Sequence, residues 1–215
     1  MLYEIYFNYL IGMLTDWMYF YWYLKGNKYA DVVVGAYKSG VFVYIPSRPV
    51  IQMKSDVSFK PQYIDLERKV CSWSTKAVRV ACVTLEYCFL YGGRTVPDTI
   101  DIEIRIRLDA RQPKSRRHFF LETDDSQLLD TIKLQKGIEL CQNIMTYVRP
   151  DIRDKLTPME AEMTLHLPTG EPSSESPVLD AHHQYNSSTT LTIFKDCGQD
   201  SVCNPDLKLT TKTYL

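Results

Sequence analysis

The sequence predicts an all-β protein that folds as an antiparallel β-sandwich. Apolar and polar residues alternate with a period of two in several segments, and turn signals separate those segments at near-regular spacing. No long segment shows the period of about 3.6 residues that marks an amphipathic helix. Short strands without intervening helices indicate two sheets packed face to face.

The two clearest strands have one apolar and one polar face. In "TIDIEIRIRLDA", residues 99–110, every even-numbered residue from Ile100 to Leu108 is apolar and the residues between them are charged. "PMEAEMTLHLP", residues 158–168, alternates in the same way and places His166 on the polar face, as a surface residue rather than a metal ligand. Each pattern predicts a strand with one face in the core and the other in water.

A third strand, "AVRVACVTLEYCFL" at residues 77–90, changes its apolar phase between Cys82 and Val83, which predicts a β-bulge at that point. Five further segments of suitable length and composition lie between turn signals such as Gly92-Gly93 and Arg149-Pro150. They are Val50–Phe59, His118–Leu121, Leu129–Leu134, Leu140–Val148 and Thr189–Phe194.

Two segments are harder to assign. The apolar residues of 128–134 also fit one face of a helix, but Thr131-Ile132 and the Lys136-Gly137 turn favour a strand. Residues 167–189 are rich in Pro, Ser and Gly and are predicted to be a loop. Adjacent residues of an extended loop point apart, so His182-His183 is expected to be exposed rather than to bind a metal.

Charge and motifs exclude several functions. The chain has 25 basic and 26 acidic residues, so it has no excess of positive charge that would attract nucleic acid. It contains no glycine-rich phosphate loop, no G-x-S-x-G and no H-E-x-x-H, and its acidic residues are dispersed over strand faces. The residues therefore give no catalytic constellation, and the protein is not expected to be an enzyme.

The six cysteines are even in number and separated by 11, 6, 53, 56 and 6 residues: Cys71, Cys82, Cys88, Cys141, Cys197 and Cys203. No Cys-x-x-Cys occurs, and the four histidines are scattered or adjacent, so disulfides are favoured over free structural thiols or a metal site. Disulfides imply an oxidising, extracellular compartment. Asn186-Ser187-Ser188 is the only N-glycosylation sequon, in a stretch predicted to be a surface loop.

The first residues, "MLYEIYFNYLIGMLTDWMYFYWYLKG", do not form a recognisable signal peptide or membrane span. They have no basic start and no small-residue cleavage site, and Glu4, Asn8 and Asp16 interrupt the apolar run. Residues 1–25 are therefore expected not to be part of a folded domain.

The residues that follow resemble an integrin alpha chain. "DVVVGA" at 31–36, "VFVY" at 41–44 and "SRPV" at 47–50 resemble the last repeat of the integrin propeller. The cysteine series from Cys71, "VPDTIDIEIRIRLD", "RDKLTPMEAEMTLHL" and "DCGQDSVCNPDLKL" resemble the thigh domain and the knee that follows it. The resemblance covers about residues 26–209.

The resemblance implies a division of the chain: a remnant of the last propeller blade at 26–47, an immunoglobulin-like thigh sandwich at 48–196, and the knee with the start of a calf domain at 197–215. The chain would then be a piece of an integrin alpha subunit. It departs from the family in the propeller calcium loop. Gly26, Asn27 and Asp31 are kept, but Tyr23 and Lys25 stand where earlier oxygen ligands are needed, so that loop is expected not to bind calcium.

The resemblance also implies the chemistry of the cysteines. The implied disulfides are Cys71–Cys82, Cys88–Cys141 and Cys197–Cys203. The last closes a knee loop in which the carboxylate of Asp200 and the carbonyls of Cys197 and Val202 would bind calcium, with a further carboxylate from the next domain. This chain alone is therefore expected to bind calcium weakly or not at all.

The function implied is that of a cell-adhesion receptor at the plasma membrane. An integrin alpha chain pairs with a beta subunit and binds an extracellular-matrix or cell-surface ligand, and its thigh is a stiff connector between the head and the lower leg. The alternatives are a generic secreted immunoglobulin-like binding module and, less favoured, a cysteine- or zinc-dependent enzyme.

Overall fold

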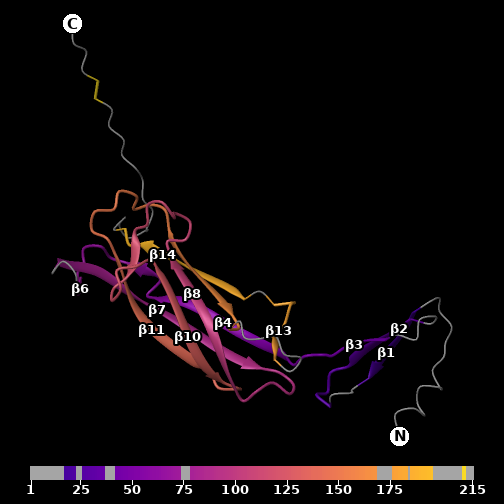
Figure 1. The fold of residues 1–215 in the computed structure, drawn as a ribbon. Helices are drawn as coiled ribbons and strands as arrows, with labels where there is room; N and C mark the ends of the chain where they lie inside the picture. The colour runs from indigo at the N-terminus through magenta and orange to yellow at the C-terminus, as the bar shows by residue number, and fades with distance from the viewer. Residues whose placement is uncertain are drawn as a thin grey trace.

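The computed structural model describes residues 17–22, 26–36, 42–73, 78–168, 176–183, 185–195 and 210–211. These residues form strands, turns and loops, with no helix among them. No helix long and apolar enough to cross a membrane is therefore found in the described ranges. Two sheets packed face to face make the sandwich, and a smaller three-stranded sheet lies beyond one end of it (Figure 1). The predicted all-β sandwich is confirmed.

The first sheet of the sandwich has five strands in the order β10-β8-β12-β14-β5. Its neighbours are antiparallel except for β14 and β5, which are parallel at one edge. The strands are β5 (Tyr63–Ile64), β8 (Thr99–Leu108), β10 (Gln127–Gln135), β12 (Met159–His166) and β14 (Asn186–Ile193).

The second sheet has six strands, in the order β13-β4-β7-β11-β9 with β6 also paired to β7. Only the pairing of β13 with β4 is parallel. The strands are β4 (Val50–Lys60), β6 (Cys71–Trp73), β7 (Val78–Gly92), β9 (His118–Phe120), β11 (Leu140–Val148) and β13 (Val178–Leu179).

One continuous apolar core fills the space between the two sheets. The predicted alternation holds in β8 and β12, where Ile104 and Met163 are each 1% exposed and His166 is exposed on the outer face. Strand β10 is also confirmed against the helical alternative, because its nine residues pair one to one with β8.

The predicted bulge between Cys82 and Val83 is wrong. β7 pairs with β11 without interruption, from Ala81 opposite Val148 to Phe89 opposite Leu140. The apolar residues of β7 switch from even-numbered to odd-numbered positions because apolar side chains cover both faces of the strand near its start. Val83 and the alternate residues after it enter the main core, whereas Val80 and Cys82 face outward into a second cluster with Trp73, Phe119 and Tyr147.

The predicted loop over 167–189 is wrong in two places. Val178–Leu179 forms β13 by pairing with the first residues of β4, and β14 begins at Asn186 rather than at residue 189. Both additions depend on partner strands that are distant in the sequence. The polar residues Asn186 and Ser188 fit β14 because they lie on its exposed face.

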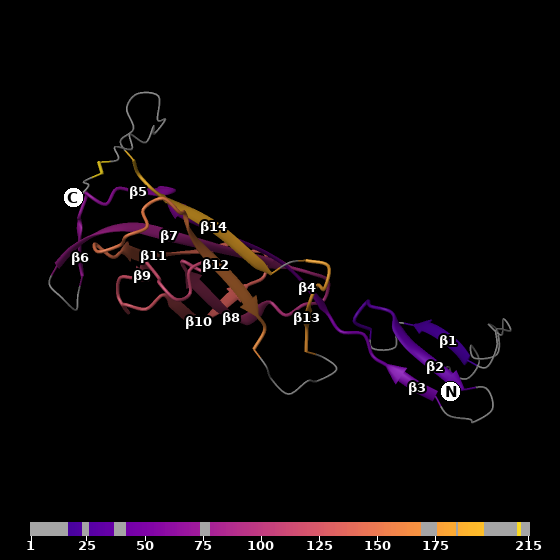
Figure 2. The same ribbon diagram turned by 90° about the horizontal axis from the view of Figure 1, so that it is seen from above.

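The third sheet lies beyond the end of the sandwich at which β4 begins (Figure 2). It consists of β1 (Trp17–Trp22), β2 (Asp31–Ala36) and β3 (Phe42–Ile45), all antiparallel. β1 corrects the expectation that residues 1–25 stand outside any folded unit, because it pairs along its whole length with β2. Its sequence, WMYFYW, consists mainly of aromatic residues, which favour strands once a partner is present.

Candidate functional site

The residues predicted to form the knee, Cys197, Asp200, Val202 and Cys203, lie outside the described residues. Their disulfide and their calcium ligands therefore stay predictions. The remaining predicted site residues, four cysteines and Asn186, all lie on the outer faces of the sandwich.

Within the described ranges, one disulfide joins Cys71 to Cys82 and another joins Cys88 to Cys141. These are the pairs that the resemblance implies. Cys88 lies directly opposite Cys141 on neighbouring strands, with their Cα atoms 4.1 Å apart. Both bonds connect strands of the same sheet, β6 to β7 and β7 to β11, and neither joins one sheet to the other. Every cysteine of the described ranges is bonded, so none of these is a free thiol nucleophile.

In the segment that resembles the propeller calcium loop, the buried carboxylate of Asp31 accepts hydrogen bonds from Ser47. Asp31 is fully buried, and its Oδ1 accepts from the backbone N–H of Ser47 at 2.7 Å and from the Ser47 hydroxyl at 2.8 Å. The Asn27 amide donates to the Ser47 carbonyl at 3.1 Å. Within the described part of the chain, no group of three or more His, Cys, Asp or Glu side chains could hold a metal.

The three-stranded sheet meets the sandwich through a small polar joint. The Tyr29 hydroxyl donates to the carbonyl of Arg94 at 3.1 Å and accepts from the N–H of Val50 at 3.3 Å. The Thr95 hydroxyl donates to the carbonyl of Asn27 at 2.8 Å. Gly93 is required here, because its φ is +144° and a Cβ atom would collide with the Val50 carbonyl.

At the opposite end, a buried ion pair fastens the connections between the two sheets. Asp109 follows β8 and Arg117 precedes β9, and their side chains are 0% and 4% exposed. The guanidinium donates to both carboxylate oxygens, at 2.7 and 2.9 Å, and also to the carbonyl of Thr157 at 2.9 Å. Hydrogen bonding to Asp109 raises the pKa of Arg117, so the pair stays charged. No local sequence pattern predicts this pairing.

His118, next to this ion pair, is fully buried. The Thr146 hydroxyl donates its proton to the carbonyl of Val83 at 2.9 Å, so at 2.8 Å it accepts from Nε2–H of His118. Nδ1 then has no hydrogen-bond partner. Burial lowers the pKa of His118 to about 3, since protonation of Nδ1 would create an unpaired buried charge.

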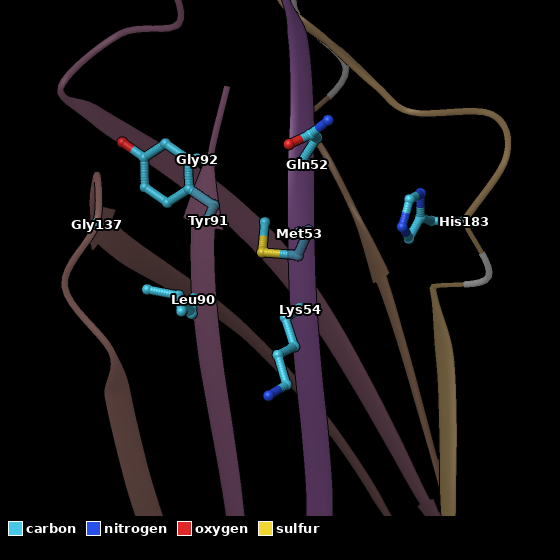
Figure 3. A pocket seen from close by; sticks show the side chains of 8 residues that line it. All are labelled: Gln52, Met53, Lys54, Leu90, Tyr91, Gly92, Gly137 and His183. Carbon is cyan, nitrogen blue, oxygen red and sulfur yellow. The ribbon is translucent and has the colours of Figure 1, made fainter. Parts of the chain in front are cut away.

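A shallow pocket lies over the β4–β7 pair, lined by residues that include Lys54, Tyr91 and His183 (Figure 3). Its side chains do not converge on one point, because His183 lies on the far side of β4 from Tyr91. His183 is exposed and its Nδ1 is 3.0 Å from the carboxylate of Asp180. The pocket lacks the converging polar groups that a catalytic or ligand site requires.

The described residues form an all-β sandwich of two sheets, with two disulfides, Cys71–Cys82 and Cys88–Cys141, that each connect strands of the same sheet. The family model described as "Integrin alpha Ig-like domain 1" matches residues 47–196. This chain belongs to the integrin alpha family, and the sandwich is its immunoglobulin-like domain.

Known integrin alpha chains match most of this chain. It is 33% identical over 202 residues to integrin alpha-PS2 of Drosophila melanogaster, covering 88% of this chain and 14% of that protein. It is 32% identical to integrin alpha-5 of Xenopus laevis and 30% identical to human integrin alpha-8, each covering 86% of this chain and 18% of the relative. The chain thus spans less than a fifth of the length of these relatives. The solved apo form of the Calx CBD1 domain matches with a TM-score of 0.34 and 10% identity, too weak a likeness to bear on function.

The buried neutral His118 predicts a pH dependence of stability. In the unfolded chain an imidazole has a pKa of about 6.5, so below that pH the unfolded state binds a proton that the folded state excludes. The free energy of unfolding should therefore be fully retained above pH 6.5 and fall by about 1.4 kcal/mol per pH unit below it, or roughly 2 kcal/mol at pH 5. Urea unfolding at pH 7 and pH 5 should show this loss in the native chain and a much smaller loss in His118→Gln. An equal loss in both chains would show that other groups cause it.

Proposed function

We propose that this chain forms the upper leg of an integrin alpha subunit, in the extracellular part of a plasma-membrane adhesion receptor. Its immunoglobulin-like domain acts as a stiff connector between the ligand-binding head and the lower leg. The subunit pairs with an integrin beta subunit, and the complete receptor binds an extracellular-matrix or cell-surface ligand. Membership of the integrin alpha family and the two disulfides support this placement.

The observation that carries the proposal is the path of the chain through one continuous core. The chain enters the sandwich at Val50, where β4 begins, and β5 follows the far end of β4. β14 ends beside β5, with Ile193 opposite Ile64, so the chain leaves at the opposite end. Between the two ends the strands are long, up to the 15 residues of β7, which span about 50 Å. A force applied at one end is therefore transmitted through paired strands and a closed core.

Bending is expected at the joint rather than inside the sandwich. The joint consists of a few partly exposed hydrogen bonds: the Tyr29 hydroxyl bonds to the Arg94 carbonyl and to the Val50 N–H, and the Thr95 hydroxyl donates to the Asn27 carbonyl. Exposed hydrogen bonds contribute about 1 kcal/mol each, far less than the many buried side chains of the core. The joint is thus the softer of the two regions.

The connector proposal predicts that the sandwich keeps its length when the receptor changes shape. Spin labels attached by a chemistry that spares cysteine would be placed at Gln62 and Gln135, which are exposed at opposite ends of the domain. In the complete ectodomain, paired with its beta subunit, the label distance should have one narrow distribution that is the same in calcium and in EDTA. A second pair, Lys28 and Gln62, reports on the joint and is expected to vary more. A shift or a second population between Gln62 and Gln135 would contradict a stiff connector.

We also propose the knee as a calcium site made of the Asp200 carboxylate and the carbonyls of Cys197 and Val202. Calcium prefers six to eight oxygen ligands, so three from one small loop are too few. A carboxylate from the following domain completes the set. The disulfide between Cys197 and Cys203 presets the loop and so lowers the entropy cost of ordering it.

Calorimetric titration with calcium tests this site. An alpha chain continuing through the following domain should bind, and Asp200→Ala should weaken that binding at least tenfold, whereas Asp206→Ala, outside the loop, should leave it unchanged. The 215-residue chain should bind little calcium at the same concentration. Comparable affinity in both chains, or no effect of Asp200→Ala, would show that the loop is only a disulfide-closed turn.

A further inference from the structure

The single glycosylation sequon lies on a regular strand. Asn186-Ser187-Ser188 forms the start of β14, and the side chains of Asn186 and Ser188 are exposed. An exposed asparagine followed two residues later by a hydroxyl side chain is the acceptor of an N-linked oligosaccharide in secreted proteins. The strand was not expected here, so the direction in which an attached oligosaccharide would extend is apparent only from the fold.

The strand register places Asn186 in a row that crosses the outer face of the five-stranded sheet. Asn186 lies opposite Thr164 of β12, Thr164 opposite Arg105 of β8, and Arg105 opposite Leu129 of β10. Directly opposite residues point to the same face, and Met163 and Ile104, the neighbours in sequence, are in the core. Three strand spacings, about 14 Å, separate Asn186 from Leu129. A chain of a few sugar rings can cover that distance.

The composition of this outer face suits contact with an oligosaccharide, which is uncharged and rich in hydroxyl groups. Its charged residues are four acidic and four basic: Asp101, Glu103, Glu160, Glu162, Arg105, Arg107, Arg111 and Lys133. Four of these residues form two ion pairs, Arg107 with Glu162 at 2.6 Å and Arg111, in the turn after β8, with Glu160 at 2.5 Å. The face therefore has no net charge with which to attract a charged partner. Across β10, β8, β12 and β14 the large exposed apolar side chain is Leu129, which is 68% exposed on the edge strand β10; Tyr63, 51% exposed, lies on β5 at the opposite edge of the sheet.

We propose that Asn186 carries an N-linked oligosaccharide that lies over the outer face of β10, β8, β12 and β14 and shields Leu129. In the transfer, Nδ2 of Asn186 forms a bond to the anomeric carbon of an oligosaccharide carried on a lipid pyrophosphate. The bond from that carbon to the phosphate oxygen breaks, the lipid pyrophosphate leaves, and the amide loses one proton. The inference rests on the proposed extracellular placement, because this donor is used in the secretory pathway.

The modification is tested in the full chain, directed into the secretory pathway of animal cells by an added cleavable signal sequence and then treated with peptide N-glycosidase. The native chain should lose the mass of one oligosaccharide, and Ser188→Ala should show no such loss because it removes the sequon. Ser187→Ala is the matched control, since it keeps the sequon and removes a hydroxyl that has no hydrogen-bond partner. A secreted, disulfide-bonded native chain without the sugar would overturn this inference and leave the proposed function intact. A chain that is retained with reduced cysteines would overturn both.

The shielding is tested by the association state of the same proteins. Edge strands with exposed apolar side chains tend to pair with other chains. The exposed edge strand β3 is common to all variants, so the test is the difference between them: sedimentation should show more self-association for Ser188→Ala than for the glycosylated chain, and a return to the level of the glycosylated chain when Ser188→Ala is combined with Leu129→Lys. A glycan-free chain that stays monomeric, or associates equally with and without Leu129, would show that the oligosaccharide does not shield this face.

Discussion

Strand β7 is the constraint on which the rest of the sandwich depends. It pairs with β4, β6 and β11, and both disulfides of the described chain end on it, at Cys82 and Cys88. Its inward residues, from Val83 to Tyr91, are among the most buried of the core. Burying one such side chain contributes about 1.5–3 kcal/mol. Displacing β7 would therefore remove the centre of one sheet and one wall of the core together.

The disulfides and the core have different tasks. In the chain-entropy model, closing the 11-residue and 53-residue separations contributes about 3 and about 4 kcal/mol. Because both bonds lie within one sheet, they hold β6 and β11 on β7 but do not hold the sheets together. That task belongs to the apolar core and, at one end, to the buried Arg117, which pairs with Asp109 in the β8–β9 connection and donates to the Thr157 carbonyl in the β11–β12 connection. Removing one partner of such a pair costs about 3–5 kcal/mol, because the other charge is left buried.

The sequence predicted those strands that have the core on one face and water on the other. β8 and β12 have water on one side, so their alternation is clean and their core residues follow from it. β7 was misinterpreted because apolar residues cover both of its faces near Cys82. β5 and β13 have two residues each and exist only through pairing with distant strands. Of the candidate site, the cysteines and Asn186 could be predicted from local sequence, whereas Arg117, His118 and the joint at Tyr29 depend on tertiary contacts that no local pattern encodes.

Native-state hydrogen exchange of β7 tests the central claim most directly. If the sandwich is one stiff body organised by this strand, the amides of β7 from Val83 to Tyr91 should exchange only through global unfolding. Their exchange free energies should then be uniform and equal to the free energy of unfolding, while the amides of β2 exchange by a smaller opening. Exchange of β7 through a local opening while β8 and β12 stay protected would contradict the claim, because the two sheets would then be able to separate within the folded domain.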